Sequence, residues 1–153
     1  MLLAAAALLT APALSPAAGD KKPVIVKKTD KCQVCGMFVA KYKEWTTEII
    51  FQDGSYVAFD GPKDMMKYYF SPGKFNPSRK QADIQALFVT EYYSAALMDA
   101  RKMFYVLGSD VLGPMGAELI PVETEAKAKE FMKDHKGKKV LRFGEITRED
   151  IPE

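Results

Sequence analysis

Three sulfur-bearing side chains lie close together near the start of the chain. Cys32 and Cys35 are its only two cysteines, and Met37 follows directly after Gly36. Thiolates and thioethers are soft ligands that select soft ions, above all Cu(I). Three sulfurs satisfy an ion of low coordination number, and the two thiolates compensate its charge. The spacing therefore predicts a copper(I) site in a short surface turn, where Gly36 supplies a left-handed backbone conformation and from which the ion can be passed on.

A C-x-x-C pair alone also fits other chemistry. A structural zinc site needs four ligands, usually Cys and His, so zinc would require a carboxylate or a second subunit beside these thiols. His135, the one histidine, is better explained as a solvated side chain. A thiol-disulfide oxidoreductase would use Cys32 as its nucleophile, although no long helix follows Cys35. A plain structural disulfide is a further alternative, whereas covalent haem attachment is excluded because Gly, not His, stands at position 36.

A second candidate ligand, Met115, stands in the segment Gly113-Pro-Met-Gly116. Gly and Pro break regular structure, so residues 108–116 are predicted to form a loop in which a methionine has little core to fill. Most other internal methionines lie in periodic or apolar stretches and are expected to pack. Both a ligand role and a packing role remain open for Met115. If residues 113–116 and 32–37 converge, Met115 becomes a further sulfur donor.

The elements that must position these residues repeat one order twice. β-Branched and aromatic stretches separated by turn signals such as Asp53-Gly54 predict strands, and apolar residues at helical spacing predict helices. The first unit is expected at residues 46–51, 55–59, 62–70 and 85–91. The second is expected at residues 103–107, 117–122, 124–136 and 139–143. The sequence thus predicts an α+β protein of two ββαβ units in tandem, at about residues 46–91 and 103–143.

Two acidic residues receive structural explanations at this stage. Asp60 precedes the first predicted helix and is expected to be its N-cap, since Asp is favoured there. Asp64 is expected on the surface of that helix. Thr124 is expected to cap the second helix, and Gly137 to follow its end. Residues 92–101 show no pattern that predicts an element.

The N-terminal segment has the composition of an export signal. Residues 2–14 are nearly all apolar, small residues follow, and charge begins at Asp20. This arrangement is an h-region before a cleavage site, and it is too short to span a bilayer comfortably. We expect a secretory signal peptide at residues 1–18, a mobile arm at residues 19–31 and the folded domain at residues 32–153. Because exported proteins meet oxidising conditions, the thiol pair needs a metal or a partner to stay reduced.

Composition excludes several classes of protein. Apolar residues make up 48% and charged residues 27% of the chain, which is ordinary for a folded soluble protein. The net charge of +2, without a long block of one sign, is no footprint of nucleic-acid binding. The sequence contains neither a Ser-His-Asp order nor a phosphate-cradling glycine loop. It therefore favours a binding protein over an enzyme.

Several segments resemble the NosL family, the accessory proteins of nitrous oxide reductase. These are Cys32-Gln-Val-Cys-Gly-Met37, Phe51-Gln-Asp-Gly54, Phe59-Asp60, Asp64-Met65, Gly113-Pro-Met-Gly116 with Glu118-Leu-Ile-Pro121, and Lys139-Val-Leu-Arg-Phe143. The resemblance covers about residues 31–151. The combination of C-x-x-C-G-M with a distant G-P-M-G is specific.

The resemblance implies a periplasmic Cu(I)-binding chaperone for the copper centres of nitrous oxide reductase. It implies that enzyme, or another copper enzyme, as acceptor, and contact with a membrane transporter complex of the maturation system. The implied fold is similar to that of organomercury lyase, without lyase activity. Family members are often lipoproteins with a cysteine at the processing site. No cysteine precedes Cys32 here, so an exported form without a lipid anchor is expected.

Overall fold

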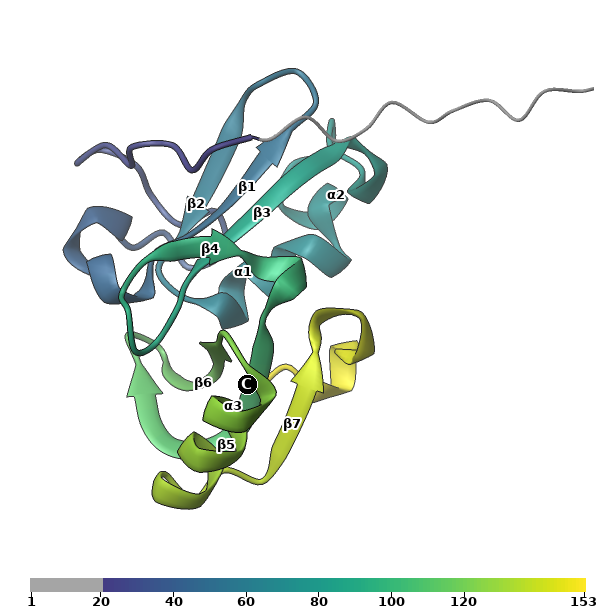
Figure 1. The fold of residues 1–153 in the computed structure, drawn as a ribbon. Helices are drawn as coiled ribbons and strands as arrows, with labels where there is room; N and C mark the ends of the chain where they lie inside the picture. Colours follow the sequence, from purple (N-terminus) through teal and green to yellow (C-terminus); the bar gives the residue numbers. More distant parts are fainter. Residues whose placement is uncertain (1–20) are drawn as a thin grey trace, which may run out of the picture.

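The computed structural model describes residues 21–153 and contains two antiparallel sheets, each with its own helices. The signal peptide predicted at residues 1–18 lies outside the described residues. Figure 1 shows the first sheet with helices α1 and α2 beside it, and the second sheet with α3 below. None of the helices between residues 21 and 153 combines the length and apolar character that a bilayer crossing needs.

The first unit forms a four-stranded antiparallel sheet in the order β2-β1-β3-β4. Its elements are β1 (Thr47–Phe51), β2 (Tyr56–Phe59), α1 (Pro62–Phe70), α2 (Pro72–Phe75), β3 (Ile84–Thr90) and β4 (Leu97–Asp99). The β1–β2 hairpin turns at Asp53-Gly54, where Gly54 has a φ of 82° that suits glycine. Pro at the first position of α1 fits the helix start, where a missing N–H costs nothing.

The second unit repeats this topology in a three-stranded sheet of order β6-β5-β7. Its elements are β5 (Phe104–Gly113), β6 (Gly116–Val122), α3 (Glu125–Asp134) and β7 (Lys139–Arg142). In both units the first strand pairs antiparallel with the second and third strands of that unit, β1 with β2 and β3, and β5 with β6 and β7. The predicted α+β class and tandem ββαβ order are confirmed. The Thr124 cap is also confirmed, because its side chain accepts a hydrogen bond from the Lys127 N–H.

The predicted loop over residues 108–116 is wrong. Strand β5 continues through it, with an irregular register between Leu107 and Leu112, and pairs again with β6 as far as Gly113. Only Pro114 and Met115 remain as the turn. The positive φ of Gly108, 72°, marks the irregular stretch, and such an irregularity bends a strand without ending it. The structure also adds β4 and α2, which no sequence pattern predicted.

Two hydrophobic cores hold the units together. In the first, helix α1 buries Met65, Met66 and Tyr68 completely against the sheet. The Tyr68 ring lies 5.3 Å from the Phe59 ring and 5.7 Å from that of Phe75, measured between centroids. The second and smaller core contains Val106, Ile120, Val122, Ala128 and Phe131. Helix α1 also contacts β6, so its N-terminal turn lies where the two units meet.

The segment before Cys32 packs on the face of β1 opposite α1. Glu48 alternates with the core residue Ile49 and therefore points to that face. Its carboxylate accepts a hydrogen bond of 2.9 Å from the Val24 N–H. Tyr56 donates a hydrogen bond of 2.6 Å to Asp30. Residues 21–31 form no helix or strand, and the mobility expected for them stays a prediction.

Candidate metal centre

The two cysteines lie in a tight turn that the backbone closes on itself. The Gly36 N–H donates to the Cys32 carbonyl at 2.9 Å, and the Cys32 N–H donates to the Met37 carbonyl at 2.8 Å. Gly36 has a φ of 79°, the left-handed conformation predicted for it. The turn leaves Cys32 buried and Cys35 half-buried. Both thiols therefore lie on the same side of one short loop.

Two carboxylates at the start of helix α1 reach these thiols. Cys32 Sγ donates to Asp64 Oδ2 at 3.3 Å, and Cys35 Sγ donates to Asp60 Oδ1 at 3.2 Å. Asp60 and Asp64 are buried, with 1% and 4% of their surfaces exposed. One ligand atom from each of the four residues lies within 4.8 Å of the others. Among residues 21–153 this group of Cys32, Cys35, Asp60 and Asp64 is the candidate metal centre.

The structural roles expected for Asp60 and Asp64 are corrected by this geometry. The N-cap of α1 is Gly61, which has no side chain that could cap the helix. The carboxylate of Glu118, from β6, accepts a hydrogen bond of 2.8 Å from the Lys63 N–H and satisfies the helix start instead. A side chain at Gly61 or Gly113 would collide with this carboxyl group. Because Glu118 occupies the capping position, Asp60 is free to face the thiol of Cys35.

Burial sets the protonation of the centre. Burial raises the pKa of the Cys32 thiol far above its ordinary value, and the neighbouring Asp60 carboxyl group raises it further. The same causes, burial first, raise the pKa of the Cys35 thiol to about 11. Both sulfurs are consequently thiols at neutral pH in the metal-free chain. Since metals bind thiolates, loading of this centre must release protons.

The donor set fits a metal ion. Asp60 Oδ2 is buried without a hydrogen-bond partner, which is costly in a protein interior unless something else satisfies the atom. Two sulfurs suit Cu(I), whereas carboxylate oxygens are harder ligands. Two thiolates with two carboxylates also suit Zn(II), which binds sulfur and oxygen. The structure thus supplies the carboxylates that the zinc alternative required.

The two methionine candidates lie in different turns, Met37 in the cysteine turn and Met115 in the β5–β6 turn. Met37 is half-buried and closes the cysteine turn through its carbonyl. Met115 is 46% exposed, which weakens the packing explanation for it. Lys63 Nζ donates to the Met115 carbonyl at 2.6 Å, and Lys63 precedes Asp64. The β5–β6 turn therefore lies against the same first turn of α1 as the thiols, and the ligand roles of Met37 and Met115 stay predictions.

His135 lies away from the four-residue group. Its ring stacks on Phe131 at 4.4 Å, and its Nδ1 lies 3.3 Å from Asp110. These contacts belong to the second unit. His135 is thus not one of the four grouped residues.

Sequence reasoning missed Asp60 and Asp64 as neighbours of the thiols. Their spacing of i and i+4 places two carboxylates on one face at a helix start, and this is the signal that was available. Lys63 and Glu118 were also missed. Both are almost fully buried, which is unusual for charged residues and marks them as structural supports of the centre.

Comparison with known proteins agrees with the fold. The family model described as NosL matches residues 23–151. The copper-binding lipoprotein NosL of Stutzerimonas stutzeri is 27% identical over 129 residues, which cover 83% of this chain and 67% of the relative.

Two solved structures share the fold. The crystal structure of the copper chaperone NosL from Shewanella denitrificans has a TM-score of 0.70 at 21% identity. The match covers 84% of this chain and 98% of the Shewanella chain. The solution structure of apo-NosL from Achromobacter cycloclastes has a TM-score of 0.51 at 24% identity. The match covers 69% of this chain and 87% of the Achromobacter chain. Because the family model spans most of the sequence, this chain belongs to the NosL family.

Proposed function

We propose that this chain is an exported copper(I) carrier, a binding protein and not an enzyme. The observation that carries the proposal is the group of two thiols and two carboxylates within 4.8 Å of one another. Cys32 and Cys35 are the principal donors, and Met37 and Met115 complete a sulfur-rich set. The relative from Stutzerimonas stutzeri, a copper-binding lipoprotein, supports the choice of metal. Soft sulfur ligands select Cu(I) over harder ions.

The carboxylates give the centre a means of exchange. Each thiol already donates its hydrogen to a carboxylate oxygen, Cys32 to Asp64 and Cys35 to Asp60. When Cu(I) binds, two protons leave the sulfurs, and these oxygens are their nearest acceptors. When copper departs, the same groups return the thiols to their protonated state. Competition between protons and metal weakens net affinity, and a carrier needs binding that is tight yet exchangeable.

A thiol-disulfide oxidoreductase is disfavoured by the same contacts. Such an enzyme needs a stabilised thiolate, supplied by a nearby cation or a helix N-terminus. Here carboxylates accept hydrogen bonds from both thiols, and burial raises both pKa values. An insulin-reduction assay tests this alternative directly. Turnover comparable to that of a thioredoxin would contradict the carrier proposal.

The proposed partners follow from the family. We place the chain in the periplasm, with nitrous oxide reductase or another copper enzyme as acceptor and a membrane transporter complex as a further partner. The family's association with nitrous oxide reductase motivates this assignment. Copper transfer from the loaded chain to the metal-free acceptor, followed by the acceptor's absorption spectrum, tests it.

The metal is tested by anaerobic reconstitution of the reduced chain with Cu(I) against a competing chelator. The wild type is expected to take up about one ion per chain, and Cys32→Ser/Cys35→Ser to take up none. X-ray absorption should report sulfur neighbours around copper. Unchanged uptake by the double variant, or only oxygen and nitrogen neighbours, would overturn the proposal.

Zinc is the second candidate because Asp60 and Asp64 lie at the thiols. An Asp60→Asn/Asp64→Asn variant separates the two metals. Carboxylates are poor ligands for Cu(I) and good ones for Zn(II). The variant is therefore expected to retain Cu(I) and lose Zn(II). Loss of both metals alike would instead assign the carboxylates to the copper ligand set.

A further inference from the structure

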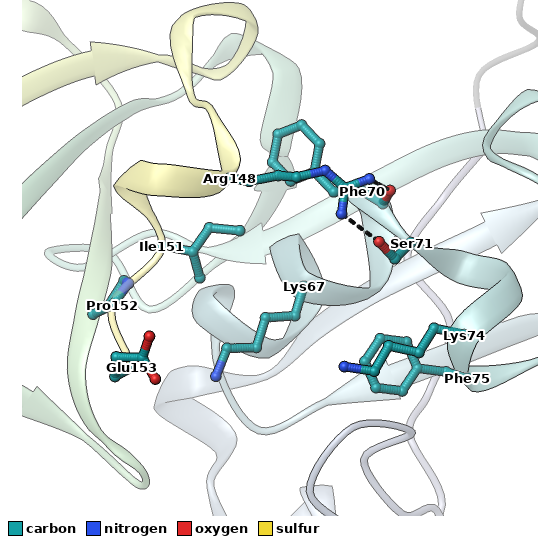
Figure 2. A pocket seen from close by; sticks show the side chains of 9 residues that line it. All are labelled: Lys67, Phe70, Ser71, Lys74, Phe75, Arg148, Ile151, Pro152 and Glu153. Atoms are coloured by element: carbon teal, nitrogen blue, oxygen red, sulfur yellow. Dashed lines mark hydrogen bonds between the residues drawn. The ribbon is translucent and has the colours of Figure 1, made fainter.

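A cavity of about 260 Å³ lies between helices α1 and α2 and the C-terminal residues 148–153 (Figure 2). Three of its lining residues are cationic, namely Lys67, Lys74 and Arg148, and one, Glu153, is acidic. Phe70 and Phe75 add aromatic walls. The candidate metal centre has no residue in this lining, so the cavity is a separate feature of the molecule.

The cations are oriented by neighbouring groups. Arg148 donates to the Ser71 hydroxyl and to the Phe70 carbonyl, and its guanidinium lies 5.6 Å from the Phe70 ring centroid. Lys74 Nζ lies 5.5 Å from the Phe75 ring centroid. Figure 2 shows the ammonium end of Lys74 beside the Phe75 ring and that of Lys67 extending toward Glu153. Cations held over aromatic rings in this way keep their remaining donors available.

Negative charge balances only part of this group, since Glu153 lines the cavity and Lys67 lies 3.9 Å from Asp64. Between residues 21 and 153, neither Lys74 nor Arg148 forms an ion pair within 4.0 Å. The acidic neighbour Asp150 is held by Lys139 at 2.6 Å. Glu149, next to Arg148 in the chain, is exposed. The cavity therefore presents an excess of positive charge to solvent.

We propose that this cavity binds an acidic segment of a protein partner, with a carboxylate between the cations and an apolar side chain against Phe70 and Phe75. The inference rests on the proposed function, because the partner we assign is a protein that exchanges copper with this chain. Lys67 links the two places: its Nζ lies 3.9 Å from Asp64, the carboxylate that accepts the hydrogen bond of Cys32. Lys67, which lines the cavity, thus lies one helical turn from Asp64.

The mixed lining selects a peptide over a small anion. A free anion would be satisfied by the cations alone, whereas the aromatic walls need an apolar group to cover them. Electrostatic complementarity at such a rim mainly guides and accelerates association. Binding is therefore expected to be weak and sensitive to salt, as suits a transient transfer complex.

The test is an amide NMR titration of the reduced, metal-free chain with a short peptide in which glutamates flank a phenylalanine. Shifts are expected at Phe70, Ser71, Phe75, Arg148 and Ile151, and they should weaken with added salt. Lys74→Glu/Arg148→Glu should lower affinity about tenfold, at a few-fold for each exposed charge. Lys28→Glu/Lys133→Glu changes the net charge equally at exposed positions elsewhere and should leave affinity unchanged.

Three outcomes would overturn the proposal. These are equal affinity for the peptide with glutamine in place of glutamate, an equal loss in the Lys28/Lys133 control, or the same shifts with inorganic phosphate alone. The titration contains no copper, so its failure leaves the carrier function intact. Conversely, Lys74→Glu/Arg148→Glu should take up Cu(I) normally, and if the wild type itself took up none, the assignment to a copper-exchanging partner would fall.

Discussion

Cys32 donates a hydrogen bond of 3.3 Å to Asp64, a residue 32 positions further along the chain. The contact joins the cysteine turn to the first turn of helix α1. It is matched by the bond from Cys35 to Asp60. Each thiol is therefore paired with a buried carboxylate, so protons and a metal ion compete for the same two sulfurs.

The first prediction concerns thiol acidity. Asp60→Asn should lower the pKa of the Cys35 thiol from about 11 by roughly one unit, because the change removes an adjacent negative charge that opposes thiolate formation. Burial, the larger cause, remains. The pH dependence of the alkylation rate measures the shift. Asp134→Asn, at an exposed position in α3, is the control, and an unchanged Cys35 pKa would show that Asp60 does not influence the sulfur.

The second prediction concerns the β5–β6 turn. Met115→Leu should weaken Cu(I) binding about tenfold, since one soft donor is lost. The free energy of unfolding should change by less than about 0.5 kcal/mol, because the side chain is 46% exposed. Chelator competition and urea unfolding measure the two quantities. Met132→Leu, in helix α3, should leave copper affinity unaltered, and an equal effect of both substitutions would remove Met115 from the ligand set.

The local elements were predictable because local rules govern them. Pro62 and the apolar spacing that follows define α1, and Asp53-Gly54 defines the first hairpin. The segment from Gly108 to Gly116 was misjudged because its glycines were interpreted as breakers. Gly113 and Gly116 in fact pair with each other across a two-residue turn. Strand β4 was missed because three residues carry no periodicity and depend on pairing with β3.

The residues of the candidate site also fall into those that local sequence patterns predict and those that only the folded chain brings together. The cysteine turn is local, so its residues and the conformation of Gly36 followed from the sequence. Asp60 and Asp64 reach the thiols only through the folded chain, and Asp60 already had a sufficient local explanation as an N-cap. The true cap, Glu118, lies 55 residues from Lys63. Rules that consider only residues close in sequence cannot detect that Glu118 takes the capping role expected of Asp60.

The third prediction concerns Lys63, which is 2% exposed. Lys63→Met should cost about 2 kcal/mol of unfolding free energy, because the ammonium group donates to the carbonyls of Met115 and Glu153 and such charged hydrogen bonds are strong. Urea unfolding measures the loss. Lys67→Met, whose side chain is 35% exposed, should cost far less.

A double-mutant cycle sharpens this prediction. Lys63 lies beside Glu118. Burial raises the pKa of Glu118 to about 8, and the positive charge of Lys63 opposes this increase. Above pH 8, where Glu118 is ionised, Lys63 compensates a buried charge, so at about pH 9 Lys63→Met should cost less in the Glu118→Gln background than in the wild type. Additive effects of the two substitutions would mean that the residues act independently.

The last prediction concerns pH. Burial raises the pKa of Glu48 from 4.5 to about 7, so the folded chain holds a proton on this group over a range in which the unfolded chain has lost it. Stability therefore falls as pH rises from about 4.5 to above 7. Glu118, with a pKa raised to about 8, contributes with the same sign.

Glu48→Gln should accordingly flatten this dependence and raise stability at pH 8 by about 1–2 kcal/mol, because an uncharged amide is cheaper to bury. At about pH 4 the variant and the wild type should be nearly equal, since the carboxyl group is then largely protonated in both the folded and the unfolded chain. Urea midpoints at the two pH values measure both effects, with Glu44→Gln, an exposed neighbour, as control. A variant that keeps the full wild-type slope would show that Glu48 is solvated, and that the segment around Val24 does not cover it in solution.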